Sequence, residues 1–367
     1  MNIEFLRALR DLEKERGLST EMLLEAIEAA LLSAYRRNFG STQNARVYID
    51  RETGECRVFV QRVVVESVND PRGEISLEEA RAIDPRYEVG NIVEIEVTPR
   101  DFGRIAAQTA KQVVVQRIRE AERNMIYEMY AGREGDIITG TVQRVEQRHV
   151  YIELVKTEAV LPPTEQIPGE RYRPGDRVRA YILEVRKTPK GPQITVSRTH
   201  PGFLRRLFEI EVPELQEGLV EMKAVAREPG IRSKIAVYSR DPNVDPVGAC
   251  VGPKGTRVQA VVNELRNEKI DVVRWDPDPS RFIAEALSPA KAVAVEVWEE
   301  EKIARVIVPD NQLSLAIGKE GQNARLVAKL TGWKIDIKSE SQMEEIYARE
   351  YAAFYGEQER EEGFVER

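Results

Sequence analysis

The feature that most constrains the fold is an internal repeat in the C-terminal half of the chain. A five-residue phrase, made of a β-branched apolar residue and the pattern Gly-x-x-Gly, occurs at 251–255 and again at 317–321. Each copy precedes a helical pattern and then a strand pattern, Lys-Ile-Asp-Val at 269–272 and Lys-Ile-Asp-Ile at 334–337. Because the same order occurs twice, we expect one α+β unit present in two copies.

Apolar alternation and helical spacing extend each copy in both directions. Strands are predicted at 219–227 and 233–239 before the first phrase, and at 292–298 and 303–308 before the second. Helical patterns follow the phrases at 256–268 and 322–330, and further helices are predicted at 201–210 and 279–287. Each copy thus has the order of a KH domain of type II, with two strands, a helix, the Gly-x-x-Gly loop, a second helix and a third strand.

A Gly-x-x-Gly loop between two helices suits the RNA backbone for three physical reasons. The glycines let the chain turn sharply and let a phosphodiester approach closely. The amides and the positive dipole end of the next helix favour a phosphate, and Lys254 and Lys319 add a cation to each loop. KH domains clamp about four nucleotides in this way. The predicted RNA-binding residues of the loops are Gly252, Pro253, Lys254, Gly255, Gly318, Lys319, Glu320 and Gly321.

A different architecture is expected from 133 to 199. Five short strands are predicted between Pro- and Gly-rich turns, at 135–144, 149–154, 159–161, 177–186 and 193–198. Five strands in so short a segment suit a small closed barrel, with the OB fold as the leading candidate and an SH3-like barrel as the alternative. The opening 135–142, the turn 174–178 and the closing 194–198 resemble the RNA-binding OB module first named for a ribosomal protein.

The first 132 residues contain no RNA-binding motif. Two helical patterns, the second from Ser19 or Thr20 to Gly40, precede a hairpin around Glu52-Thr53-Gly54 and a strand at 91–97. A long helix is predicted from Gly103 to Ala131, either as a packed edge of this domain or as a rigid connector to the barrel.

Charge and cysteine content restrict the class of protein. The net charge is −7 and only 133–199 is net basic, so RNA affinity must come from local sites and not from a basic surface. Two cysteines allow neither a disulfide framework nor a thiolate zinc site, which favours the cytoplasm. No segment reaches the apolar length of a membrane span, and no signal peptide is recognisable.

The phrases around the two loops are similar to those of the bacterial transcription factor family NusA. The resemblance rests on Asp245–Gly252 with Lys254–Gln259 in the first copy, and on Gly318–Leu326 in the second. Arg119–Arg123 and Phe208–Pro213 with Glu214 are also similar, and the likeness covers roughly residues 1–340 in one order.

The resemblance implies a multidomain α+β protein with five parts. These are an N-terminal α/β polymerase-binding domain with a long connector helix (1–132), an OB barrel (133–199), a first KH domain (200–276), a second (277–345) and an acidic tail (346–367). It implies a monomeric, cytoplasmic factor without cofactor or enzyme activity that modulates pausing, intrinsic termination and antitermination. Its expected partners are RNA polymerase, nascent single-stranded RNA and other Nus factors.

The resemblance also adds candidate RNA contacts outside the loops themselves. Arg257, Asn323 and Arg325 occupy positions that match the family's loop phrases. In the barrel, Arg198 matches the family's arginine on the last strand, where we expect an exposed side chain, and Tyr151 is the one aromatic residue expected on the RNA face. With so few aromatic residues, the barrel is expected to contact phosphates rather than to stack on bases.

Motifs for catalysis are missing from the sequence. His149 and His200 are far apart, and neither a phosphate-binding loop nor a Gly-x-Ser-x-Gly elbow occurs. Cys250 is expected to be a small buried residue rather than a reactive thiol. The alternative is a subunit of an RNA-processing or RNA-degrading enzyme that combines OB and KH modules, but 1–132 is too short for a phosphorolytic core. A ribosome-associated structural protein would be strongly basic.

Overall fold

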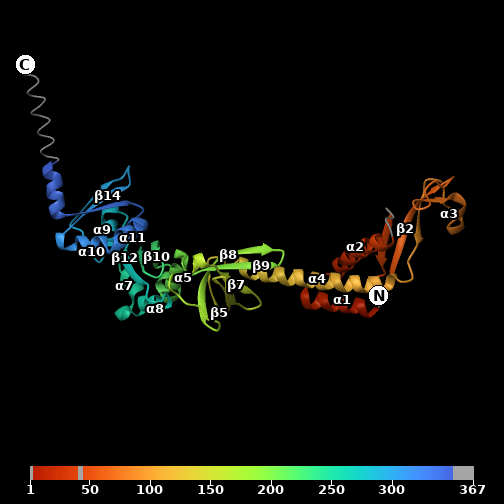
Figure 1. Cartoon of the computed structure of the whole chain (residues 1–367), viewed down its shortest axis with the longest axis horizontal. Helices are drawn as coiled ribbons and strands as arrows, with labels where there is room; N and C mark the ends of the chain where they lie inside the picture. The colour runs from red at the N-terminus through yellow and green to blue at the C-terminus, as the bar shows by residue number, and fades with distance from the viewer. Residues whose placement is uncertain (1–2, 40–43, 350–367) are drawn as a thin grey trace, which may run out of the picture. The chain divides into compact units, whose positions relative to one another are not determined.

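The computed structural model describes residues 3–39 and 44–349 and divides the chain into two compact units (Figure 1). The first unit is Met1–Glu128 and the second is Met129–Arg367. The first holds helices around a small sheet, whereas the second holds a barrel and two α+β modules. The predicted multidomain α+β fold is therefore confirmed.

The core of the first unit forms between three helices and one face of a sheet. Helix α1 (Ile3–Arg16) and helix α2 (Thr20–Phe39) bury leucine and isoleucine side chains at helical spacing, including Leu6, Leu9, Ile27 and Leu31. Phe102, Ala106 and Ala110, each four residues apart, bury the first turns of α4 (Phe102–Ala131) in the same cluster. The start of the long helix is thus a packed domain edge.

Strand β2 (Cys56–Val65) joins all parts of the sheet in the first unit. Strand β1 (Ala45–Ile49) pairs with its first half, and β4 (Ile92–Glu96) pairs with its middle, both antiparallel. The sequence did not predict β3 (Glu74–Ser76), which pairs in parallel with the end of β2, or α3 (Leu77–Ile83). Ser76 caps α3 by accepting from the Glu79 backbone N–H.

The second unit begins with a closed five-stranded barrel of the predicted OB type. Its strands are β5 (Ile137–Glu146), β6 (His149–Glu153), β7 (Glu158–Leu161), β8 (Arg177–Thr188) and β9 (Gly191–Ser197). They close in the order β5-β6-β7-β9-β8, and the only parallel pair among these described strands is β7 with β9. Buried residues alternate with half-buried or exposed ones along β6 and β7, so the buried apolar side chains fill the barrel.

Two modules with one topology follow the barrel. The first comprises α5 (Pro201–Glu211), α6 (Pro213–Gln216), β10 (Val220–Glu228), β11 (Arg232–Ser239), α7 (Pro246–Val251), α8 (Thr256–Glu264) and β12 (Lys269–Arg274). The second comprises α9 (Pro279–Ala286), β13 (Ala294–Trp298), β14 (Ile303–Val308), α10 (Leu313–Ile317), α11 (Gln322–Thr331) and β15 (Lys334–Ser339). In each sheet the middle strand is antiparallel to the first and parallel to the last, as expected for type II KH domains.

The second module covers the outer face of the first module's sheet. On β11, Ile235 and Val237 point into the first module's own core, and Ala236 between them belongs to the core cluster of the second module. Ala226 and Val273 join Ala236 there, and α9 and α11 contact the strands of this face. The two KH modules therefore share buried apolar surface, which fixes one against the other.

A helix over 340–349 follows β15, and its residue Met343 is buried. The acidic tail expected at 346–367 lies outside the described residues from 350 on. Across 3–39 and 44–349, no helix combines the length and the apolarity that crossing a bilayer requires.

Candidate nucleic-acid interface

The two Gly-x-x-Gly loops have nearly identical backbones. Gly252 and Gly318 end the preceding helices at φ 76°, ψ 171° and φ 77°, ψ 170°, a region that only glycine adopts readily. The third loop residue is left-handed in both copies, with φ 53° at Lys254 and φ 55° at Glu320. The shared backbone shows that the sequence repeat is also a repeat of local structure.

Matching the two loops by their backbone angles shows where they differ in charge. Lys254 corresponds to Glu320, and Lys319 corresponds to Pro253. All four side chains are exposed. The expectation that each loop carries a lysine holds, but the two lysines occupy different positions. The second loop adds a carboxylate where the first has an ammonium group, so the two modules present different fields to a phosphate.

Arg257, a predicted RNA contact, lies behind the first loop. Its Nη1 donates to the Ala249 carbonyl oxygen at 2.6 Å and to the Glu214 carboxylate at 2.8 Å. A Cβ atom at Gly252 would lie 2.7 Å from Arg257 Cγ, so the first glycine is needed for close packing as well as for its φ angle. Arg257 therefore holds the loop against the module, with its guanidinium directed to the protein.

Asn323, at the corresponding place in the second loop, is buried with 2% of its surface exposed. Its Nδ2 donates to the carbonyl oxygens of Leu287 at 3.1 Å and Ala316 at 2.9 Å. A Cβ atom at Gly318 would lie 2.8 Å from Asn323 Cβ. The side chain ties the loop to the core of its module, and its predicted contact with RNA stays a prediction.

Exposed apolar residues that the sequence did not predict lie beside the second loop. Leu315 and Ile317 on α10 are 47% and 37% exposed, directly before Gly318. Ile335 and Ile337, on the strand that carries the repeated Lys-Ile-Asp motif, are only partly buried. A clamped RNA backbone would bring bases to such a surface. The signal was available, because apolar residues precede the glycine in both copies.

Tyr151 on β6 is half-buried, and one face of its ring carries a cation. The guanidinium carbon of Arg144 on β5 lies 3.9 Å from the ring centroid. Arg144 also forms a bidentate pair with Glu158, whose carboxylate raises the pKa of the guanidinium above its ordinary value. At this place the barrel therefore combines a cation with an aromatic ring, and Arg144 is a candidate contact that the sequence did not single out.

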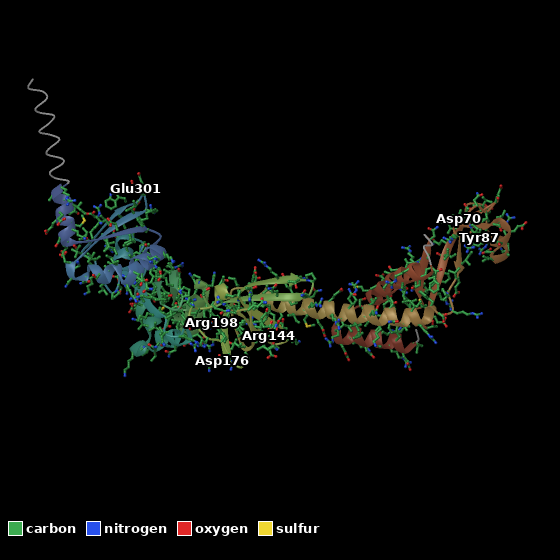
Figure 2. All side chains as sticks on the ribbon, in the orientation of Figure 1. Asp70, Tyr87, Arg144, Asp176, Arg198 and Glu301 are labelled. Carbon is green, nitrogen blue, oxygen red and sulfur yellow. The ribbon has the colours of Figure 1, made fainter. Side chains whose placement is uncertain are left out.

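The expectation that Arg198, which is labelled in Figure 2, is an exposed strand-end residue is wrong. Only 2% of its surface is exposed. Its guanidinium bonds Glu170 at 2.9 Å in the barrel, and the Glu264 carboxylate at 3.1 Å and the Glu264 carbonyl oxygen at 3.0 Å in α8. A charged residue was assigned to the surface because charges are rarely buried, but here carboxylates from two modules compensate it. Arg198 joins the barrel to the first KH module.

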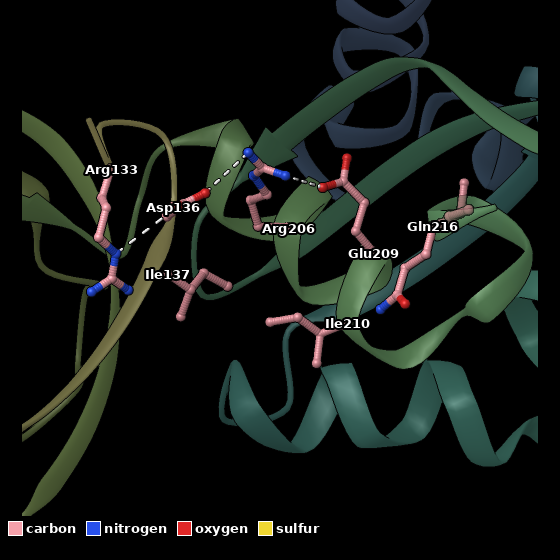
Figure 3. A pocket seen from close by; sticks show the side chains of 8 residues that line it. Arg133, Asp136, Ile137, Arg206, Glu209, Ile210 and Gln216 are labelled. Carbon is pink, nitrogen blue, oxygen red and sulfur yellow. Dashed lines mark hydrogen bonds and ion pairs between the residues drawn. The ribbon is translucent and has the colours of Figure 1, made fainter. Parts of the chain in front are cut away.

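The crease between the barrel and α5 contains a cavity of about 570 Å³ whose charges are paired internally (Figure 3). Arg206 lies between Asp136 at 3.1 Å and Glu209 at 2.8 Å, and it also donates to the Gly135 carbonyl oxygen. Arg133 lies 4.0 Å from Asp136. Because these cations and carboxylates neutralise one another, the crease adds further ion pairs to the contact that Arg198 makes between the barrel and the first KH module.

Cys250 is buried in the core of the first KH module, as predicted. Burial raises the pKa of its thiol to about 12, so the reactive thiolate is scarce at neutral pH. A buried, protonated thiol at the end of α7 fills space next to the loop.

A five-stranded OB barrel joined to two type II KH modules defines a class of RNA-binding protein. Four family profiles match the chain in order: the NusA N-terminal domain at 4–124, the S1 RNA binding domain at 133–197, the NusA-like first KH domain at 198–275 and the NusA-like second KH domain at 279–345.

Proteins named transcription termination/antitermination protein NusA are similar over nearly the whole chain. Identity is 64% to that of Halalkalibacterium halodurans, with 94% of this chain and 91% of the relative covered. It is 64% to that of Bacillus subtilis, with 95% of each covered, and 48% to that of Thermus thermophilus, with 91% and 89% covered. The chain belongs to the NusA family.

Proposed function

We propose that this protein is a transcription elongation factor that acts in pausing, intrinsic termination and antitermination. The barrel and the two KH modules hold nascent single-stranded RNA, and residues 1–132 dock on RNA polymerase. The name shared by its relatives supports the process. The observation that carries the RNA-binding part is the pair of loops with one backbone conformation, 252–255 and 318–321, on modules that share a core.

The packing of the modules favours binding of one RNA strand along several sites. The Arg198 junction fixes the barrel to the first KH module, and the Ala226–Ala236 face fixes the second module to the first. Sites held at fixed separations need little ordering when RNA binds, so each occupied site raises the effective concentration at the next. Damage to one site should therefore cost more than its own share of the affinity.

Polymerase docking is assigned to 1–132 because this segment matches the family's N-terminal domain and contains no RNA motif. Arg36 and Arg37 are exposed in the last turn of α2 and are the first side chains to replace. In a pull-down with purified RNA polymerase, residues 1–132 should bind and residues 133–345 should not. The reverse result would show that docking belongs to the RNA-binding modules.

Further parts of the proposal follow from the family. The protein acts as a monomer in the cytoplasm, together with other Nus factors, and it has no catalytic activity of its own. No described feature favours the alternative of an RNA-degrading enzyme subunit. Incubation of the pure protein with labelled RNA and inorganic phosphate should leave the RNA intact, whereas phosphate-dependent shortening would support the enzyme.

The RNA-binding proposal is tested by replacing the middle residues of each loop. Pro253-Lys254→Asp-Asp and Lys319-Glu320→Asp-Asp keep the glycines and place two carboxylates where a phosphate should lie. Each variant should lose more than half of the affinity for a labelled pool of RNA of about twelve nucleotides, measured by fluorescence anisotropy. The salt dependence of binding should also fall, because fewer phosphates are neutralised.

A matched control is available in the barrel. The exposed turn between β8 and β9 contains another Pro-Lys-Gly sequence, and Pro189-Lys190→Asp-Asp makes the same change in charge as Pro253-Lys254→Asp-Asp, but outside the KH modules. This variant should lose less affinity than either loop variant. Equal losses in this variant and in Pro253-Lys254→Asp-Asp would mean that net charge, and not the KH loop, controls binding. Circular dichroism confirms that each variant is folded.

The assigned process is tested with purified polymerase on a template that encodes a hairpin-stabilised pause. Addition of the protein should lengthen the pause, and the loop variants should lengthen it less. A pause of unchanged duration would contradict the proposed role in elongation.

A further inference from the structure

The loop of the second KH module is held by a residue of the first. Glu228 is the last residue of β10, and its carboxylate reaches the first turn of α11, directly after the second loop. One oxygen accepts from Gln322 Nε2 at 2.9 Å, and the other accepts from Arg325 Nη1 at 2.8 Å. Arg325 also donates to the carbonyl oxygen of Glu320, inside the loop, at 3.0 Å. A chain of hydrogen bonds thus runs from one module into the loop of the other.

The first loop is braced by a similar pair that lies entirely within its own module. Arg257 bonds Glu214 of α6, which belongs to the same KH domain. Gln259, the counterpart of Arg325, bonds Asn263 on its own helix. Each loop is therefore braced by an arginine and a carboxylate, but only the second loop takes its carboxylate from the neighbouring module.

A carboxylate beside a phosphate-binding loop weakens RNA binding by charge repulsion. The Glu228 side chain is 15% exposed, and that of Arg325 is 53% exposed. Although burial raises it, the hydrogen bonds from Gln322 and Arg325 hold the pKa of Glu228 below its ordinary value, so the group is charged at neutral pH. A negative charge at this place lowers the affinity for RNA, so its presence calls for a structural role that offsets this loss.

We infer that Glu228 is a positioning residue through which the first KH module sets the geometry of the second module's RNA-binding loop. Its two oxygens orient the first turn of α11 and, through Arg325, the backbone at Glu320. RNA binding by the second module then depends on docking to the first. This inference rests on the proposed function, because it assumes that the second loop binds RNA.

The direction in which one substitution changes the RNA affinity separates a positioning role from a purely electrostatic one. Glu228→Gln keeps the shape but leaves one oxygen and one amino group facing two donors, so one of the two bonds is lost. If Glu228 acts only as a charge, its removal should tighten binding of the twelve-nucleotide RNA pool. If it positions the loop, binding should weaken about threefold to tenfold, the scale of changes along a coupled network. Glu221→Gln removes a carboxylate from the same strand, away from the loop, and should not weaken binding.

A double-variant cycle distinguishes positioning from a general effect on folding. In the Lys319-Glu320→Asp-Asp background the second loop no longer binds RNA, so Glu228→Gln should have no further effect there. A loss of equal size in both backgrounds, or tighter binding in the wild-type background, would overturn the inference. If Glu228→Gln does not fold, Gln322→Ala removes one of the two donors and should weaken binding in the same direction.

The same cycle separates failure of the inference from failure of the proposed function. Unchanged affinity in Lys319-Glu320→Asp-Asp would mean that the second loop does not bind RNA, and both would fall. Weaker binding in that variant together with unchanged binding in Glu228→Gln would leave the RNA site in place and refute only the positioning role.

Discussion

Replacing Arg198 by Met tests whether this residue joins two modules or contacts RNA. The variant keeps most of the apolar volume but leaves Glu170, itself only 2% exposed, without its main partner. Removing one member of a buried ion pair typically costs about 3–5 kcal/mol. We expect about 3 kcal/mol here, at the lower end of that range, because Arg266 still lies 2.9 Å from Glu170. For a unit of this size, the loss corresponds to a fall in melting temperature of roughly 6–12 °C.

The assay is differential scanning calorimetry, with attention to the transition of the unit Met129–Arg367. Arg186→Met is the control, because Arg186 is 71% exposed and its pair with Glu184 should contribute at most about 1 kcal/mol. A melting temperature unchanged in Arg198→Met, together with lost RNA affinity, would refute the buried junction and restore the surface contact that the sequence predicted.

Three further predictions concern the KH modules. Gly252→Ala should destabilise the unit by about 1–3 kcal/mol and more than Gly321→Ala in urea unfolding, because only the first Cβ would meet Arg257, at 2.7 Å. Burial raises the pKa of Asp271, but hydrogen bonds from two cations hold this pKa below the ordinary value. The ionised carboxylate therefore stabilises the folded protein above about pH 4, and this stabilisation is lost as the pH falls through the depressed pKa. The free energies of unfolding of wild type and Asp271→Asn should converge toward pH 2. Cys250 should resist iodoacetamide at pH 8 in the folded protein and react once urea unfolds it.

Sequence patterns within single segments predicted the long helix, the barrel strands and the two KH modules. The long helix was expected from Gly103 and begins at Phe102, and all five barrel strands lie where alternation placed them. The repeat predicted both KH modules, since the shared Gly-x-x-Gly pattern favours the same backbone, as the φ angles of Lys254 and Glu320 show. The proposed domain boundaries remain predictions.

Contacts between distant segments could not be predicted in the same way. Arg198 and Asn323 belong to residue types that are usually exposed, and only their partners in other elements explain their burial. The same holds for Arg227 and Glu268, which form a buried bidentate pair across 41 residues of sequence. A short strand such as β3 has three residues and too little alternation to be recognised.

The second KH module packs on the outer face of the first module's sheet, and the equivalent face of the second module's sheet is chemically different. Where the first sheet has Ala226 and Val273, the second has Glu296 and Lys338 at the corresponding positions of its register. Arg305, between those strands, lies 3.7 Å from Glu296. The Tyr347 hydroxyl of the helix over 340–349 donates to Glu296 at 2.6 Å, so this helix reaches the charged positions. We expect a terminal repeat with such polar positions on its outer face to work as the cap of a solenoid does, because another copy could not dock there in the same manner. We therefore expect the second sheet to disfavour head-to-tail growth into filaments, which is the hazard of a heterologous contact.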